Sequence, residues 1–191
     1  VGQDPCENNG HGVVATCNYV ARKYGVHSAM ASIQAVRLVP QDKLVFVAPD
    51  FKTYRSVSAQ IHSFMHDITD RVESVALDEA YLDVTHNKLG EESAVKLALD
   101  LQKRIRKEIG LNSSFGVSYN KFLAKMGSEY AKPFGRTVIL PSEAKQFLGM
   151  QKIEKFPGVG PKTQEQLHKL GVYTGADLQQ VDVLVLLNKF K

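Results

Sequence analysis

Apolar residues recur at helical spacing in two long segments of the chain. Between Phe51 and Thr69 they stand three or four residues apart, as expected for an amphipathic helix. Between Ser93 and Ile109, leucines and isoleucines line one face, while lysines and arginines lie largely on the other. Gly110 follows at a position that favours a helix end. The pattern therefore predicts two amphipathic helices.

Four short β-prone runs alternate with these helices. The first two are separated only by Asp78, Glu79 and Ala80, which predicts a β-hairpin. The predicted strands cover 72–77, 81–84, 115–118 and 137–140, and a further helix covers 120–130. The order from about residue 70 to 140 is β-β-α-β-α-β, and one more strand upstream would complete an antiparallel sheet covered by two helices. The fold class predicted here is α+β, with a ferredoxin-like centre.

The segments on either side of this centre contain shorter predicted elements and more turn residues. Residues 1–12 are rich in Gly and Asn and predict a loop. Short elements are predicted after it: a strand over 13–16, a helical turn over 19–24 and a buried strand over 44–47. After Pro141, Gly/Pro turns join short predicted helices over 143–148, 153–155, 161–170, 175–180 and 183–189. We place a domain boundary near Pro141.

Composition and charge narrow the functional class. Of the 191 residues, 43% are hydrophobic and 23% charged, which excludes disorder and collagen-like repeats. No apolar run approaches the roughly 18 residues of a membrane span, so we expect no membrane partner. Two cysteines cannot form a disulfide framework by themselves, so we expect free thiols in a reducing compartment, the cytoplasm. Residues 51–100 hold nine acidic and five basic side chains, whereas residues 101–140 hold two and eight. This distribution suits a divalent metal beside a polyanion, but it also occurs in proteins that bind neither.

Asp78 and Glu79 lie at the tip of the predicted hairpin. Neighbours in a regular strand point to opposite faces, but a tight turn lets two adjacent carboxylates converge. Carboxylate oxygens are the ligands that Mg²⁺ prefers, commonly together with substrate phosphates. An Asp-Glu pair is also common as solvated surface charge, so the pair alone leaves both interpretations open.

The segment from Phe156 to Thr163 has the sequence FPGVGPKT. Its glycines let backbone N–H groups approach a phosphate, and Pro161 favours a helix start there. Leu167, Leu170 and Val172 would hold the flanking helices together. The pattern predicts a helix-hairpin-helix motif that binds the DNA backbone, with a helical hairpin without a ligand as the alternative.

Lys132, Arg22 and Tyr19 are residue types that bind triphosphates. The sequence alone does not bring residues 19–22 near residue 132. The helix that opens at Asn120 carries Lys121 and Lys125, which we interpret as solvated lysines of a capped amphipathic helix.

Taken together, these segments resemble the Y-family DNA polymerases, most closely the DinB-type branch. The matching stretches are GVVATCNYVARKYGVHSAM (12–30), SVALDEAYLDVT (74–85), GVSYNKFLAKMGSEYAKPFG (116–135) and IEKFPGVGPKTQEQLHKLGVYTGADL (153–178). They occur in the family's order and spacing and span nearly the whole chain.

The resemblance implies three domains: fingers over 1–50, palm over 51–140 and a helical thumb over 141–191. Asp78 and Glu79 match catalytic carboxylates that bind metal, with two Mg²⁺ ions in the complete enzyme. The residues that match the nucleotide-binding group are Tyr19, Arg22 and Lys132, with Thr16 beside them. The DNA-binding hairpin corresponds to Gly158, Val159 and Gly160, followed by Lys162 and Thr163.

The implied activity is template-directed, low-fidelity translesion DNA synthesis by nucleotidyl transfer. Its implied partners are primer–template DNA and deoxynucleoside triphosphates, with a sliding clamp reached through a region outside these 191 residues. The family's first strand, with its Asp-x-Asp carboxylate, and its little-finger domain have no match here, so we expect a fragment of a polymerase that lacks the first metal carboxylate. Two alternatives remain: a non-catalytic DNA-binding module that uses the helix-hairpin-helix, and a nucleotide cyclase, against which that motif argues.

Overall fold

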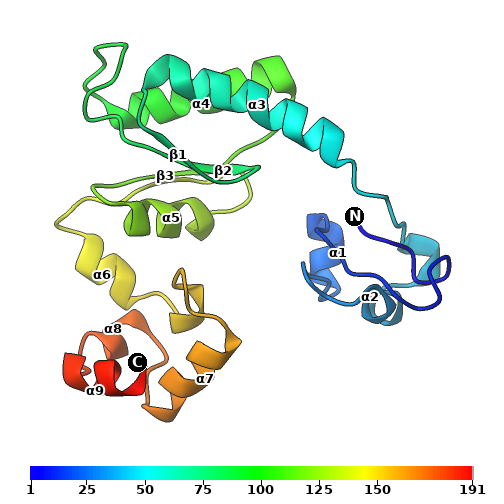
Figure 1. The fold of residues 1–191 in the computed structure, drawn as a ribbon. Helices are drawn as coiled ribbons and strands as arrows, with labels where there is room; N and C mark the ends of the chain where they lie inside the picture. The colour runs from blue at the N-terminus through cyan, green and yellow to red at the C-terminus, as the bar shows by residue number, and fades with distance from the viewer. Residues whose placement is uncertain (191) are drawn as a thin grey trace. The chain divides into compact units, whose positions relative to one another are not determined.

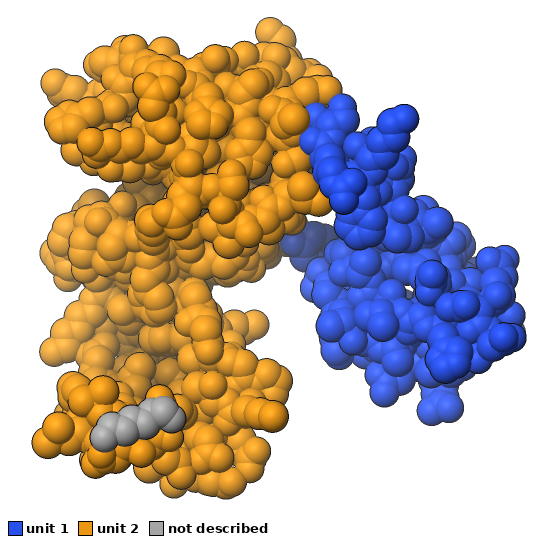
Figure 2. Space-filling view, in the orientation of Figure 1, with its two compact units in different colours: residues 1–56 blue, residues 57–191 orange. Residues whose placement is uncertain are grey.

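The structure, a computed structural model, describes residues 1–190 as two compact units. The first comprises Val1–Ser56 and the second begins at Val57, as the colours of Figure 2 show. The division falls inside helix α3 (Phe51–Ile68). This helix confirms the first of the two amphipathic helices predicted from the apolar pattern. The three domain ranges implied by the family resemblance stay a prediction.

The first unit has little regular structure besides helices α1 (Tyr19–Lys23) and α2 (Ser32–Leu38) and the 3-10 turn η1 (Gln41–Lys43). Its core is a cluster of five buried residues, Val14, Val26, Met30, Ala35 and Val39. Cys6 and Cys17 are free thiols.

The two strands predicted in the first unit do not form. Val13 and Val14 make only isolated bridges, to Ala31 and Gly2. The segment 44–47 is not a buried strand, since the Val45 side chain is 78% exposed. A ladder needs a neighbouring strand along its length, whereas the Val47 carbonyl only accepts a hydrogen bond from the Gly2 N–H, at 2.9 Å.

The second unit contains two small sheets. Strands β1 (Val72–Ala76) and β2 (Glu79–Leu82) form the predicted antiparallel hairpin, with Val72 opposite Leu82. Strands β3 (Phe115–Val117) and β4 (Arg136–Val138) pair in parallel. The expectation of one antiparallel sheet is therefore corrected, although the α+β class is confirmed. The reason is that helix α5 (Lys121–Tyr130) connects β3 to β4, and a strand-helix-strand crossover returns the chain in the same direction.

Helix α4 (Ala94–Ile109) begins where Ser93 caps the Lys96 N–H and ends at Gly110, whose φ of 81° is left-handed. It buries Leu97 and Ile105 from the predicted apolar face. Its Gln102 is also buried, because it donates to the Ser113 carbonyl and accepts from Arg136, both at 2.7 Å. Figure 1 shows α3 and α4 on one side of the strands and α5 on the other.

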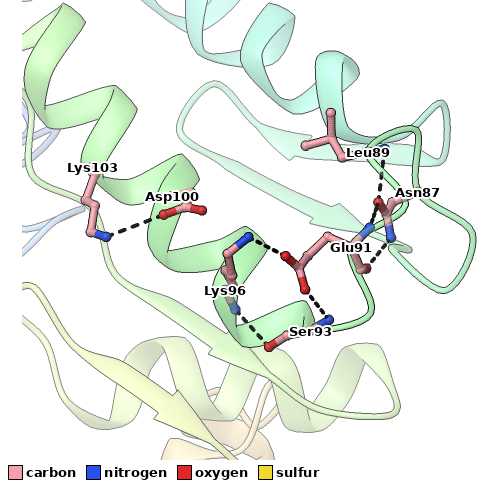
Figure 3. Close-up of polar contacts among 7 residues, drawn as sticks. All are labelled: Asn87, Leu89, Glu91, Ser93, Lys96, Asp100 and Lys103. Atoms are coloured by element: carbon pink, nitrogen blue, oxygen red, sulfur yellow. Dashed lines mark hydrogen bonds and ion pairs between the residues drawn. The ribbon is translucent and has the colours of Figure 1, made fainter.

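The loop between β2 and α4 is ordered by its own polar side chains (Figure 3). The Asn87 amide donates to the Val84 and Glu91 carbonyls and accepts from the Leu89 and Glu91 N–H groups. Glu91 in turn accepts from the Ser93 N–H at 3.0 Å and pairs with Lys96. These bonds lead the chain from the hairpin into the N-terminus of α4.

Helix α5 lies unusually close to β3 because two glycines face each other. A Cβ on Gly116 would lie 2.1 Å from the carbonyl oxygen of Ala124, and one on Gly127 would lie 3.2 Å from the Cα of Gly116. Only hydrogen atoms fit at such a contact. The glycines therefore set the position of the helix that carries Lys121, Lys125 and Glu129.

The segment after Pro141 is helical, as predicted. Its elements are α6 (Ala144–Gly149), η2 (Ile153–Lys155), α7 (Pro161–Lys169), α8 (Gly175–Leu178) and α9 (Val183–Lys189). They enclose a core of Ile153, Phe156, Leu167 and Val172, which Met126 of α5 joins. No helix among residues 1–190 is long and apolar enough to cross a membrane.

Candidate active site and nucleic-acid interface

The predicted carboxylates lie at the turn of the β1–β2 hairpin. Asp78 is exposed in the two-residue turn, and Glu79 is the half-buried first residue of β2, opposite Ala76. The Ser58 hydroxyl of α3 donates to the Leu77 carbonyl at 2.5 Å and fixes the turn from behind. Both carboxylates thus belong to a hydrogen-bonded hairpin whose turn is also bonded to α3.

Glu79 is linked to Lys132 through two residues of α5. Lys125 Nζ donates to Glu79 Oε2 at 2.7 Å and to Glu129 Oε1 at 3.1 Å. Lys132 Nζ donates to the same Glu129 oxygen at 2.7 Å. We call these four residues the charge row. It connects a predicted metal ligand with a predicted triphosphate-binding cation.

The charge row shifts the pKa of its two central members. Burial lowers the pKa of the Lys125 ammonium, but hydrogen bonds to Glu79 and Glu129 outweigh burial and leave that pKa raised. Burial raises the pKa of Glu129, and hydrogen bonds from Lys132 and Lys125 more than compensate, so its pKa is lowered. Both groups are therefore charged at neutral pH.

The interpretation of Lys125 as a solvated lysine is wrong. Its side chain is only 23% exposed, whereas that of Lys121 is 61% exposed and pairs with Glu73 on β1. Lys125 and Glu129 are four residues apart, which places them on one face of α5, and Lys132 follows just beyond the end of that helix. That spacing was the available signal, but the sequence did not show that the face points at Glu79.

The chemistry of the carboxylates fits a divalent cation in part. No group of three or more His, Cys, Asp or Glu side chains in the described part of the chain could hold a metal alone. Mg²⁺, however, commonly binds one or two carboxylates and completes its shell with substrate phosphates and water. Glu79 already faces a cationic group, the Lys125 ammonium.

The remaining nucleotide-binding candidates lie in the first unit. Tyr19 and Arg22 are exposed on successive turns of α1, with the Arg22 guanidinium 5.8 Å from the Tyr19 ring centroid. Asn18 caps this helix by accepting from the Ala21 N–H. Thr16 is exposed just before the cap. Thr16, Tyr19 and Arg22 thus lie close together in the first unit, whereas Lys132 belongs to the second unit.

The predicted helix-hairpin-helix is present between η2 and α7. Gly158 has a φ of +89°, and α7 begins with Pro161 after the extended Gly160. The first helical hydrogen bond runs from the Gln164 N–H to the Gly160 carbonyl. Within residues 1–190, the N–H groups of Gly158, Gly160, Lys162 and Thr163 have no hydrogen-bond acceptor. Four free donors thus surround the start of α7.

The surroundings of this hairpin leave room for an anion. A Cβ on Gly158 or Gly160 would meet no atom within 4 Å. Leu167 and Val172 are part of the buried helical core and Leu170 packs against it, as predicted. Val159 packs against the same core. Free N–H groups at a helix N-terminus, beside Lys162, make a suitable site for a phosphate.

Two protein-family models match the chain. The impB/mucB/samB family matches residues 4–129, and the IMS family HHH motif matches residues 141–172. DNA polymerase IV of Streptococcus pneumoniae is 53% identical over 190 residues, which are 100% of this chain and 53% of the relative. DNA polymerase IV of Streptococcus gordonii is 52% identical over the same share. The chain spans about half the length of the curated relatives it matches.

Solved structures give the same result. An insertion ternary complex of Dbh DNA polymerase superposes with a TM-score of 0.83 at 32% identity, covering 94% of this chain and 52% of the other. DinB from Sulfolobus solfataricus superposes with a TM-score of 0.83 at 33% identity, covering 92% of this chain and 51% of the other.

Proposed function

The chain belongs to the impB/mucB/samB family of DinB-type Y-family polymerases, and we propose that it provides the palm, fingers and thumb of a translesion DNA polymerase. Its reaction is template-directed nucleotidyl transfer from a deoxynucleoside triphosphate to a primer. The domains proposed are fingers over 1–50, palm over 51–140 and thumb over 141–191. A sliding clamp is a further proposed partner of the full-length protein, reached through a region outside these 191 residues.

One observation supports this function most directly. The hairpin carries Asp78 in its turn and Glu79 at the start of β2, and the charge row joins Glu79 to Lys132 through bonds of 2.7, 3.1 and 2.7 Å. Phosphoryl transfer asks a protein for positioning and charge stabilisation rather than for covalent chemistry. This reaction needs carboxylates that bind cations and a lysine that binds phosphates.

Asp78 and Glu79 are the proposed ligands of two Mg²⁺ ions. Bound there, such ions would activate the primer hydroxyl and stabilise the charge on the reacting phosphate. The protein's share is to hold both carboxylates in place, which the hairpin and Ser58 do.

Lys132, Tyr19 and Arg22 are the proposed triphosphate-binding residues, with Thr16 beside them. Lysine and arginine neutralise phosphate charge, and a tyrosine hydroxyl donates to a phosphate oxygen. The helix-hairpin-helix would bind a phosphate of the primer strand through the free N–H groups of Gly158, Gly160, Lys162 and Thr163, with Val159 between the two glycines.

Replacing Lys162 by alanine should weaken the binding of primer–template DNA equally for different sequences. The plot of log K against log salt has a negative slope, and one lost phosphate contact makes that slope less steep by about 0.9. Fluorescence anisotropy over a salt series measures that slope. Lys169→Ala is the control, because Lys169 lies at the other end of α7 and pairs with Glu165 at 2.6 Å. Equal slopes for the two variants would refute the phosphate contact.

The test of the proposed function is primer extension by the protein in its natural full length, with four deoxynucleotides and Mg²⁺. The expected product follows the template sequence and disappears with EDTA. DNA binding that survives EDTA, with no incorporation under any condition, would instead identify a non-catalytic DNA-binding module.

A further inference from the structure

Glu129 occupies an unusual position in the charge row. Lys125 and Lys132 both donate to its Oε1 atom, at 3.1 and 2.7 Å. One carboxylate oxygen can accept two hydrogen bonds, but its single negative charge is then shared between two cations. A stronger attraction between Glu129 and one of these lysines therefore weakens the attraction between Glu129 and the other.

Lys125 has a second partner that Lys132 lacks in the described part of the chain. Its Nζ lies 2.7 Å from Glu79 Oε2, closer than to Glu129. As long as Glu79 holds Lys125, Glu129 is left mainly to Lys132. If Glu79 exchanged Lys125 for another cation, Lys125 would keep only Glu129.

We propose that Glu129 is a positioning residue that couples the carboxylate site at Glu79 to the triphosphate-binding cation Lys132. This inference rests on the proposed function. With Glu79 engaged by a divalent cation, Lys125 moves onto Glu129 and neutralises it. Lys132 then gives up Glu129 and donates to the incoming triphosphate. Without that cation, Glu129 retains Lys132.

The size of the effect follows from exposure. The side chains of Glu129 and Lys132 are each 44% exposed, so water screens their attraction. Exposed ion pairs of this kind change an equilibrium by up to about five-fold. Glu129 should therefore tune nucleotide affinity and leave the rate of bond formation nearly unchanged.

The test is nucleotide binding by the full-length protein on a chain-terminated primer–template, so that no reaction occurs, with Ca²⁺ kept below saturation of the Glu79 site. Under these conditions Glu129 still retains Lys132 in part of the molecules. Glu129→Gln should therefore lower the nucleotide Kd by about two- to five-fold, because Lys132 loses its competing partner. In reactions at limiting Mg²⁺ the KM should fall by a similar factor, with kcat within about two-fold of the parent value.

A second variant tests the coupling itself. Lys125→Gln should raise the nucleotide Kd by about two- to five-fold, because Glu129 then has Lys132 alone. In the Glu129→Gln background the same change should leave the Kd unaltered, which makes the two effects non-additive. A Lys125→Gln effect that persists in the double variant would overturn the proposal.

Glu108→Gln is the matched control. Glu108 pairs with Arg104 at i, i+4 over 3.0 Å, and its side chain is 46% exposed. This variant should leave Kd and KM at parent values. The proposal is wrong if Glu129→Gln behaves like Glu108→Gln or binds nucleotide more weakly than the parent. A parent protein that neither binds nor incorporates nucleotide would overturn the proposed function as well, so the two failures are distinct.

Discussion

Alanine at either Asp78 or Glu79 should abolish nucleotide incorporation by the full-length protein, lowering the rate by about a thousand-fold or more. Charge stabilisation at the reacting phosphate is usually the largest single catalytic contribution, and each variant removes a proposed metal ligand. Single-turnover primer extension with Mg²⁺ measures the loss. DNA binding should persist in both variants, because the helix-hairpin-helix around Gly158 is a separate site.

The control for these variants lies on the same hairpin. Glu73→Gln removes a carboxylate of β1 that pairs with Lys121 in an exposed position, and it should keep nearly full activity. Glu79→Gln preserves the shape of Glu79 and should be as inactive as Glu79→Ala if charge is what matters. Full activity in either alanine variant, with an unchanged melting temperature, would refute the metal assignment.

The elements that the sequence predicts best are those whose signal is local. Helices α3 and α4 follow from apolar residues at helical spacing, and Ser93 and Gly110 mark the ends of α4 correctly. The hairpin turn follows from its position between two β-prone runs. The start of α7 follows from Pro161 after a glycine, because these residues favour the required backbone angles themselves.

What the sequence does not reveal depends on contacts between distant segments. Residues 44–47 have the composition of a strand, but no neighbouring strand within residues 1–190 pairs with them, so Val45 is exposed. The parallel pairing of β3 and β4 depends on where the crossover helix brings the chain back. Lys125 is separated from Glu79 by 46 residues, and its spacing to Glu129 is equally compatible with a solvated helix face. The charge row therefore emerges only once α5 is packed against the sheets.

Changing Gly116 to alanine should destabilise the protein by about 3 kcal/mol or more. The new Cβ would lie 2.1 Å from the Ala124 carbonyl oxygen and 2.6 Å from the Ser128 nitrogen. Both are backbone atoms of α5, so no side chain can rotate away and the whole helix must shift. In a protein of this size that loss corresponds to a melting temperature lower by roughly 6–12 °C, which urea and thermal unfolding can measure.

Gly149→Ala is the matched control for this prediction. A Cβ at Gly149, in α6, would make only ordinary contacts at 3.7 Å or more, so alanine there should be neutral or slightly stabilising. If Gly116→Ala still folds, α5 must have moved away from β3, and Lys125 must have moved with it. Nucleotide incorporation should then fall more than the remaining folded fraction explains, because Glu79 and Lys125 no longer meet at 2.7 Å. Equal stability of the two alanine variants would show instead that α5 does not need the close approach at Gly116, and that other contacts set the position of the charge row.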